Sequence, residues 1–166
     1  MGVSQNLSAP RSDMVRTLHR WWLDSGHGDV PDRSAFDPAE FTRLLPNVII
    51  SEVRHDPFRI WYRLAGTKVV EATGFNITGR YLDEMLATEP EAPWEAIYRD
   101  CYANRSAFLG TSTCRTTAGG LYTYEFVLCP LRNGGTAIEQ FVAVEDYGHL
   151  KTTLVDLVQW REKPAG

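Results

Sequence analysis

The sequence predicts an α+β domain built on a five-stranded antiparallel sheet, and three observations lead to that prediction. β-Branched and aromatic runs with alternating faces occur in two groups, residues 47–65 and 106–147. Short turns of hairpin type, two of them glycine-rich, join the runs within each group. Helical patterns gather between the groups, which excludes an alternating βα order and a parallel sheet. We therefore expect helices on one face of the sheet, with flanking helices at both ends of the chain.

The domain is expected to begin after a disordered segment. Residues 1–11 are small, polar and proline-containing, so we predict no fixed structure there. A helix is predicted over 12–25, with Ser12 as its N-cap. Its apolar face would consist of Met14, Leu18, Trp21 and Trp22. Two adjacent tryptophans require a partner surface, because an isolated helix cannot shield them from water.

The first two strands are predicted over 47–54 and 58–65. Asp37, Pro38 and Glu40 mark the start of a short helix before them, which Pro46 ends. In the second strand, Tyr62 and Arg63 fall on opposite faces. The face that carries the arginines would lie in solvent or under an aromatic cover, for which the helix over 12–25 is a candidate.

Short helices are predicted over 67–73 and 81–86, and a longer one over 91–104. Closely spaced glycines punctuate this region and permit the positive φ that tight chain reversals need. Strands should follow over 106–117, 121–131 and 136–147 as an antiparallel meander. A C-terminal helix over 148–161 is predicted from the spacing of Leu150, Leu154, Leu157 and Val158. Residues 12–161 thus form one domain.

Composition excludes several classes of protein. The formal net charge of −4 and the lack of a Lys/Arg-rich run argue against nucleic-acid binding. No apolar run approaches the ~18 residues of a membrane span, and the N-terminus has no secretory signal. The three cysteines show no CxxC spacing, which fits a reducing, cytoplasmic environment.

The order of elements and the segment 58–85 resemble PAS domains. The resemblance is to short, stand-alone PAS proteins of the alphaproteobacterial, and hence bacterial, type, and it covers about 19–147. It implies a signal-transduction sensor with an interior space for a ligand. The fold-defining turn would comprise Gly66, Thr67, Gly74, Thr78 and Gly79. The residues that carry the resemblance are those five with Tyr62, Arg63, Leu64, Arg80 and Tyr81.

Candidate ligand-binding residues are aromatic or basic positions on strands and on the longer helix. Tyr62, Tyr98, Tyr124 and Phe126 suit the wall of a pocket, and a plain core position is the alternative for each. Arg63 and Arg115 could clamp a carboxylate or phosphate, the alternative being an internal ion pair or stacking. Glu125 and Glu139 are expected on the solvated face, with a buried, ligand-reading Glu125 as the alternative.

No catalytic or metal-binding arrangement can be derived. The four histidines lack metal-ligand spacing. Haem-binding PAS domains usually take a histidine from the longer helix, and residues 91–104 contain none. Flavin-reactive PAS domains use a cysteine within an Asn-Cys-Arg-Phe run, from which Asp100-Cys101-Tyr102 departs. Haem and flavin are therefore not expected, and the cofactor is left unknown.

Three functions are compatible with these patterns. The first is a non-enzymatic sensory module that binds a small molecule, a separate signalling protein, or both. It would form a homodimer through Leu18, Trp21 and Trp22, because PAS relatives commonly pair through an N-terminal helix and the sheet; packing within the same chain is the alternative. The second is a ligand-free scaffold for dimerisation. The third is a small cone-shaped α+β enzyme with a buried acid or base, which predicts a polar dyad inside the cavity.

Overall fold

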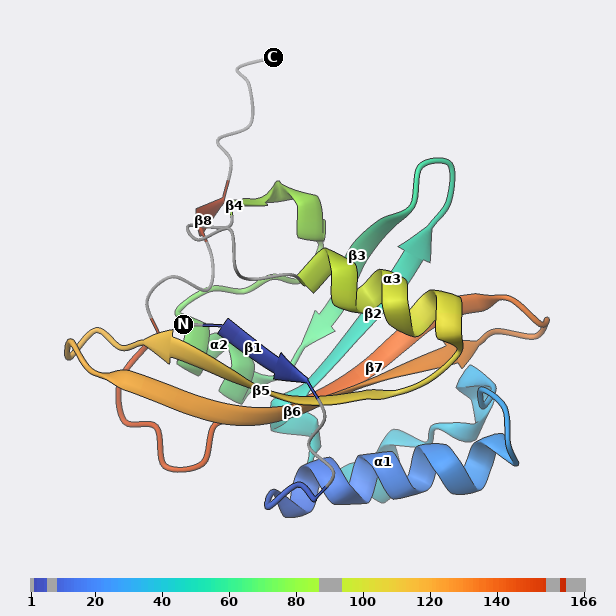
Figure 1. The fold of residues 1–166 in the computed structure, drawn as a ribbon, viewed down its shortest axis with the longest axis horizontal. Helices are drawn as coiled ribbons and strands as arrows, with labels where there is room; N and C mark the ends of the chain where they lie inside the picture. The colour runs from blue at the N-terminus through green and yellow to red at the C-terminus, as the bar shows by residue number, and fades with distance from the viewer. Residues whose placement is uncertain (1, 6–8, 87–93, 155–158, 161–166) are drawn as a thin grey trace.

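The computed structural model describes residues 2–5, 9–86, 94–154 and 159–160. Within these residues the main sheet has six antiparallel strands in the order β1-β5-β6-β7-β2-β3 (Figure 1). The strands are β1 (Gly2–Gln5), β2 (Val48–Arg54), β3 (Arg59–Ala65), β5 (Phe108–Arg115), β6 (Leu121–Arg132) and β7 (Ile138–Asp146). The five predicted strands are confirmed, and both groups share one sheet.

The sixth strand corrects the prediction that residues 1–11 are disordered. Residues 2–5 form β1, which pairs with β5 from Gly2 opposite Thr113 to Gln5 opposite Gly110. Without β1, the outer edge of β5 would present unpaired N–H and C=O groups. The small, polar composition of the segment concealed this edge pairing, because backbone groups supply it.

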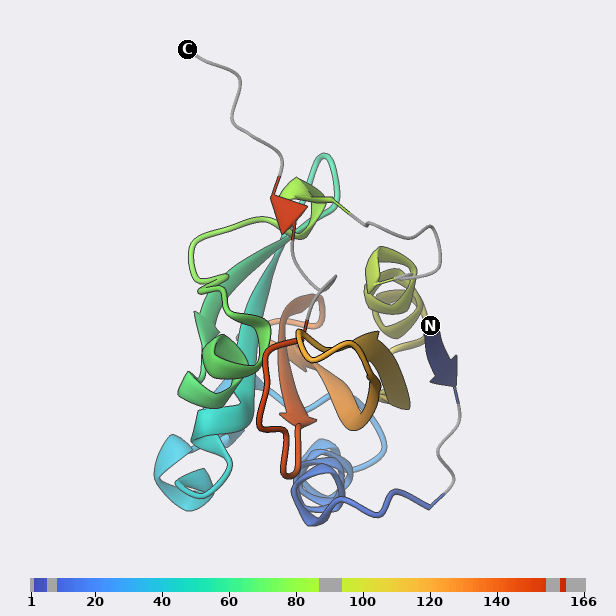
Figure 2. The same ribbon diagram turned by 90° about the vertical axis from the view of Figure 1, so that its left-hand side faces the viewer.

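Helices lie on both faces of the sheet (Figures 1 and 2). The helices are α1 (Asp13–Gly26), α2 (Thr67–Thr73) and α3 (Trp94–Asn104), with 3₁₀ turns η1 (Arg33–Ala35), η2 (Pro38–Phe41), η3 (Leu45–Asn47) and η4 (Leu82–Glu84). α2 and α3 cover the inner face, as predicted, and the flanking helix α1 covers the outer face. Strand alternation serves both layers, because Phe126 of β6 faces inward while Val127 faces α1.

α1 packs on β6 and β7, and this corrects the predicted dimer surface. Leu18 is 0% exposed, and Trp22 is buried with its Nε1–H donating to the Pro130 carbonyl at 2.8 Å. Trp21 is half-buried, with its ring edge-on to Phe36 and Phe41. The apolar stripe correctly indicated burial, but its partner is the sheet of the same chain.

The arginine-bearing face of β3 is not covered by α1. Arg59 lies over the Tyr81 ring at 3.6 Å from its centroid and binds Asp83 through two hydrogen bonds of 2.6 and 2.7 Å. Arg63 donates to Glu52 at 2.6 Å. Neighbouring side chains, some from the segment around η4, therefore take the role predicted for the tryptophans.

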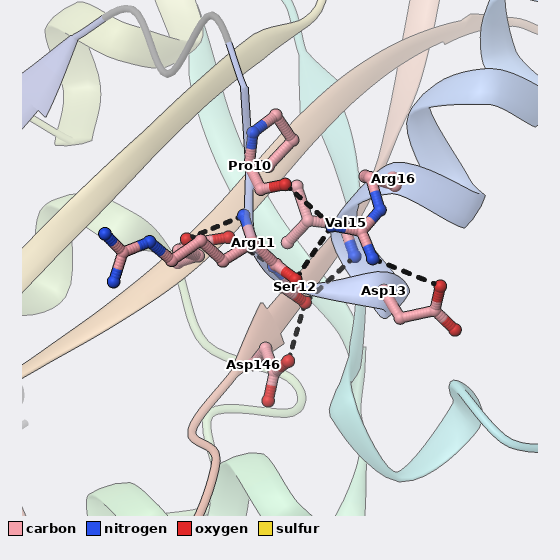
Figure 3. A network of polar contacts seen from close by, with 8 residues as sticks. Pro10, Arg11, Ser12, Asp13, Val15, Arg16 and Asp146 are labelled. Carbon is pink, nitrogen blue, oxygen red and sulfur yellow. Dashed lines mark hydrogen bonds and ion pairs between the residues drawn. The ribbon is translucent and has the colours of Figure 1, made fainter.

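The start of α1 is tied to the sheet by polar contacts (Figure 3). Ser12 Oγ accepts from Val15 N at 3.2 Å as the predicted N-cap and donates to Asp146 Oδ2 of β7 at 2.6 Å. The Glu125 carboxylate of β6 accepts from Arg11 N at 3.0 Å and Ser12 N at 2.8 Å. Because these carboxylates pair with the positive end of the helix, they fix where α1 begins.

The turn between β3 and α2 contains the closest backbone approach of the predicted glycine series. Gly66 N donates to the Val48 carbonyl at 2.8 Å. A Cβ on Gly66 would lie 2.3 Å from the Pro46 carbonyl oxygen and 2.4 Å from that of Leu45. Only glycine fits here, although the φ of −66° would suit any residue.

The other predicted turn residues hold the chain around α2. Thr67 begins α2, and Gly74 ends it with a φ of 71°. Gly79, with a φ of 81°, donates from its N–H to the Tyr62 carbonyl at 2.7 Å. Thr78 Oγ1 accepts from Ala65 N at 3.3 Å. The turn therefore returns the chain to the edge of β3.

The predicted C-terminal helix is wrong for the described residues. Residues 149–154 have no helical structure, and Leu154 N donates to the Ala72 carbonyl at 2.7 Å while Thr153 O accepts from Thr117 N at 2.9 Å. The buried Leu154 thus joins α2 to the β5–β6 hairpin. Further on, β8 (Gln159–Trp160) pairs with β4 (Met85–Leu86), where a helix over 81–86 was predicted beyond the η4 turn. Residues 155–158 lie outside the described residues.

Replacing Gly66 by alanine should destabilise the protein by about 3 kcal/mol or more, because the added methyl collides with two backbone oxygens that cannot move independently. The matched change Gly120→Ala places a methyl in open space in the β5–β6 turn. Urea unfolding of both variants measures the difference. Equal midpoints for the two variants would contradict the steric argument.

Candidate functional site

A cavity of about 60 Å³ lies between the inner face of the sheet and helices α2 and α3. One buried water needs about 10–15 Å³ by the same measure, so the space corresponds to about four to six non-hydrogen atoms. Its walls are mainly apolar, with a few polar groups. They comprise Ile49, Tyr62, Val69, Thr73, Ile77, Trp94, Tyr98, Tyr124, Phe126, Leu128, Ala143 and Glu145.

Four of the six predicted pocket residues line this one cavity. Tyr62 comes from β3, Tyr98 from α3, and Tyr124 and Phe126 from β6. All four side chains are buried. The alternation of the strands and the apolar face of the longer helix bring them together, as the sequence pattern indicated. Whether they bind a ligand is the subject of the proposal below.

The two arginines predicted as clamps do not line the cavity. Arg63 points away from Tyr62 to the other face of β3, where its side chain is exposed and bound to Glu52. Arg115 ends β5 and is exposed as well. Adjacent strand residues face opposite sides of a sheet, so Tyr62 and Arg63 could not both face the same cavity. The alternative of an internal ion pair holds for Arg63.

Glu145 of β7 is the acidic cavity residue that the sequence analysis missed. Its carboxylate accepts a hydrogen bond from the Tyr147 hydroxyl, and its backbone carbonyl accepts from Asn47 Nδ2 at 2.8 Å. Burial raises the pKa of Glu145 to about 7, while the Tyr147 hydrogen bond acts in the opposite direction. A usable signal existed, because Phe141, Ala143 and Glu145 alternate onto one face of the strand.

The tyrosines around Glu145 are neutral hydrogen-bonding groups at physiological pH. Burial raises the pKa of Tyr62 and Tyr124 well above the ordinary value, and that of Tyr98 to about 12. Ser51 Oγ donates to the Tyr98 hydroxyl at 3.5 Å. Glu145 is therefore the cavity group whose charge changes near neutral pH.

The Tyr124 hydroxyl has no partner with standard hydrogen-bond geometry among the described residues, although the Ser112 side chain is close enough to lower its pKa. The side chain is 2% exposed, and its ring lies 4.9 Å from that of Tyr147, measured between centroids. A buried, unpaired hydroxyl costs about 1–3 kcal/mol relative to a satisfied one. The cavity thus contains a polar atom that a bound molecule could satisfy.

The glutamates singled out in the sequence lie elsewhere. Glu125 is on the outer face, where it caps the start of α1. Glu139 is partly exposed, with an oxygen 3.4 Å from His55 Nε2. The expected solvated-face placement describes both better than the alternative of a ligand-reading Glu125.

The residues present do not fit a covalently bound flavin. Cys101 of α3 is 2% exposed, does not line the cavity, and has a pKa raised to about 12 by burial, so its thiol is a poor nucleophile. A flavin also greatly exceeds the size of the space. Across the described ranges, no cluster of three or more His, Cys, Asp or Glu could hold a metal ion, and no helix could cross a membrane.

Tyr124→Phe and Tyr122→Phe, two residues apart on β6, should have opposite effects on stability. Tyr124→Phe removes an unpaired hydroxyl and should stabilise the ligand-free protein by about 1 kcal/mol. Tyr122→Phe removes the hydroxyl that donates to the Tyr147 carbonyl and should destabilise it by about 1 kcal/mol. Urea unfolding checks both values; destabilisation by Tyr124→Phe would show that its hydroxyl has a partner.

Glu145 should make stability fall as pH rises from about 4.5 to about 7. Its native pKa of about 7 exceeds the ordinary 4.5, so across this window the native state holds more protons than the unfolded chain. The stabilising contribution is complete below pH 4.5 and lost above pH 7. Relative to Glu145→Gln, the wild type should lose on the order of 1–3 kcal/mol between pH 5 and pH 8.

Unfolding titrations at several pH values measure this difference. Glu71→Gln is the matched control, because this glutamate is exposed on α2 and pairs with Lys68 at 3.0 Å. Parallel stability curves for the wild type and Glu145→Gln would show that Glu145 titrates normally.

Two light-oxygen-voltage (LOV) proteins are among the solved structures that the chain resembles. One is an RNA-binding LOV receptor, at 18% identity and a TM-score of 0.49, with 87% of this chain and 38% of that chain covered. The other is the blue-light photoreceptor Aureochrome1 LOV. The structure of its light state has 16% identity and a TM-score of 0.45, with 66% of this chain and 86% of that chain covered. The structure of its dark state has 16% identity and a TM-score of 0.46, with 68% of this chain and 83% of that chain covered. No curated protein matches the chain.

A family model described as PAS domain matches residues 11–143, from the segment before α1 into β7. The match includes the glycine turn, the inner helices and all the described lining residues of the cavity except Glu145. The observed order β5-β6-β7-β2-β3 agrees with the resemblance predicted from residues 58–85. The chain belongs to the PAS domain family, whose members are sensory and signalling modules.

Proposed function

We propose that this chain is a non-enzymatic sensory module whose inner cavity binds a small molecule. The observation that carries the proposal is the Tyr124 hydroxyl, which is buried at the cavity and has no partner with standard hydrogen-bond geometry among the described residues. A filled, purely structural core would have no reason to keep such a group, because phenylalanine would occupy the same space at lower cost. A ligand with a polar atom would satisfy it.

The proposed output element is α1. Glu145 faces the cavity, and the next residue, Asp146, accepts the hydrogen bond of Ser12 at the start of α1. A ligand that favours one arrangement of this strand end would bias the position of the helix. A separate signalling protein and a homodimer stay predictions. Leu18 and Trp22 are buried, so such contacts would use the outward side of α1, where Leu23 is 52% exposed.

The two other functions differ in their support. The scaffold needs a filled core, and the cavity with its unpaired hydroxyl argues against that. The enzyme predicted a polar dyad in the cavity, and Glu145, which lines the cavity, accepts a hydrogen bond from Tyr147, which is not among the described lining residues. We keep this enzyme as the second candidate, to be recognised by product formation that Glu145→Gln abolishes. The buried cysteines support the proposed cytoplasmic location.

Filling the cavity should abolish ligand binding. Ala143 lines it from β7, and Ala143→Val adds two methyl groups to a β-branched residue that suits a strand. In a thermal-shift screen against small metabolites, wild-type protein should show a raised midpoint with at least one compound, because a ligand that binds only the native state stabilises it. Ala143→Val should lose that shift.

Ala137→Val is the matched control, since Ala137 is exposed just before β7 and should leave the shift unchanged. Mass spectrometry of the same mixtures detects any product and so separates sensor from enzyme. A screen in which no compound shifts the wild type, or in which Ala143→Val responds like the wild type, would refute the proposal.

A further inference from the structure

The charge of the cavity restricts the ligand it can take. Among the described lining residues, Glu145 is the one that can carry a negative charge near neutral pH. None of these residues is Arg, Lys or His. The arginines expected to clamp an anion point elsewhere. A carboxylate or phosphate ligand would meet Glu145 without a counter-charge in a poorly solvated space, which is strongly unfavourable. The described lining therefore disfavours binding of anionic ligands.

Aromatic faces supply the rest of the recognition chemistry. Five of the twelve described lining residues are aromatic, and they come from three elements of the fold, β3, α3 and β6. They are Tyr62, Trp94, Tyr98, Tyr124 and Phe126. Aromatic rings attract cations through their quadrupole, most strongly where water is excluded. The Tyr124 hydroxyl, unpaired among the described residues, adds an oxygen that can accept a hydrogen bond.

Resting on the proposed function, we propose that the cavity binds a small alkylammonium ion, with its charge against the Glu145 carboxylate and its methyl or methylene groups against the aromatic rings. The size of the space, about 60 Å³, admits an ion of about four to six non-hydrogen atoms. An ammonium ion with N–H groups additionally donates to the Tyr124 oxygen. The ligand thereby supplies the positive charge that the described wall lacks.

Binding of such a cation is linked to proton release. A cation favours the ionised carboxylate, whereas burial in the empty cavity raises the pKa of Glu145 to about 7. The titratable side chains that face Glu145 are Tyr62 of β3, Tyr98 of α3, Tyr124 of β6 and Tyr147, with Cys114 of β5 beyond Tyr124. Burial keeps the four tyrosines neutral below pH 9, so one group, Glu145, governs affinity near neutral pH.

The test is calorimetric titration of the full chain with tetramethylammonium chloride at pH 6 and pH 8. This ion does not titrate, so any pH dependence of affinity belongs to the protein. One group with a pKa of about 7 predicts affinity about tenfold higher at pH 8 than at pH 6. Glu145→Gln should bind at least tenfold more weakly at pH 8 and lose the pH dependence. Glu139→Gln, partly exposed on the same strand, should behave like the wild type.

Two uncharged or anionic probes separate this inference from the proposed function. tert-Butanol has the same number of non-hydrogen atoms as the cation, and acetate carries the opposite charge; both should bind far more weakly. If either binds as well as the cation, and Ala143→Val abolishes it, the alkylammonium inference is wrong and the ligand-binding cavity stands. If neither these probes nor any compound of the metabolite screen binds the wild type, both proposals fail.

Ethylammonium and Tyr124→Phe test the hydroxyl. The variant should weaken binding of ethylammonium, which has N–H donors, and leave tetramethylammonium unchanged. Equal loss for both ions would mean that Tyr124 contributes through its ring alone and would remove the hydrogen bond from the proposal. Wild-type titrations at the two pH values decide the charge requirement even if a variant folds poorly.

Discussion

The alternation of side chains at the end of β7 is the constraint on which the rest of the site depends. Glu145 faces the inner cavity, and Asp146 faces the outer layer, where it binds Ser12 at the start of α1. The period of two in a strand makes this division unavoidable once Phe141 and Ala143 face inward. The carboxylates of two consecutive residues therefore lie on opposite faces of the sheet, one in each layer. A slip of one residue would exchange the two carboxylates between the layers and would turn Val142 and Val144 towards the cavity and Phe141 and Ala143 towards α1.

This arrangement gives the cavity a short physical connection to the outer helix. Asn47 Nδ2 binds the Glu145 carbonyl, and the Tyr122 hydroxyl binds that of Tyr147, so the backbone on both sides of Asp146 is held by side chains of other elements. A change in the hydrogen bonding of the Glu145 carboxylate therefore acts on a segment whose neighbours are fixed. Coupling between two sites requires an element with two arrangements that both sites bias, and this strand end with α1 is the candidate for that element.

The sequence predicted the parts of the fold that rest on local periodicity. Strand alternation placed Tyr62 and Tyr124 correctly, and the helical stripe predicted burial of Leu18. It could not identify what Leu18 packs against, because a stripe shows that a partner exists and not which one. The extended course of the chain around Leu154 was missed for the same reason, since leucines four apart suit a helix as well as a segment that bridges α2 and a hairpin. The cavity position of Glu145 was not predicted, because two consecutive acidic residues, Glu145 and Asp146, are typical of a solvent-exposed strand end.

Polar groups at the cavity lower the stability of the ligand-free domain. Across the described residues, nearly all buried polar side-chain atoms have hydrogen-bond partners. The exceptions are the Tyr124 hydroxyl and the side-chain amide oxygen of Gln140. Tyr124 shares its cavity with a carboxylate that burial disfavours in the charged form. Replacing one partner of a buried polar group is costly, whereas replacing all of them by apolar groups is often neutral or stabilising. A core selected for stability alone would therefore have lost both groups. A cation bound here would satisfy both at once, so part of its affinity would come from relieving a cost already present in the empty protein.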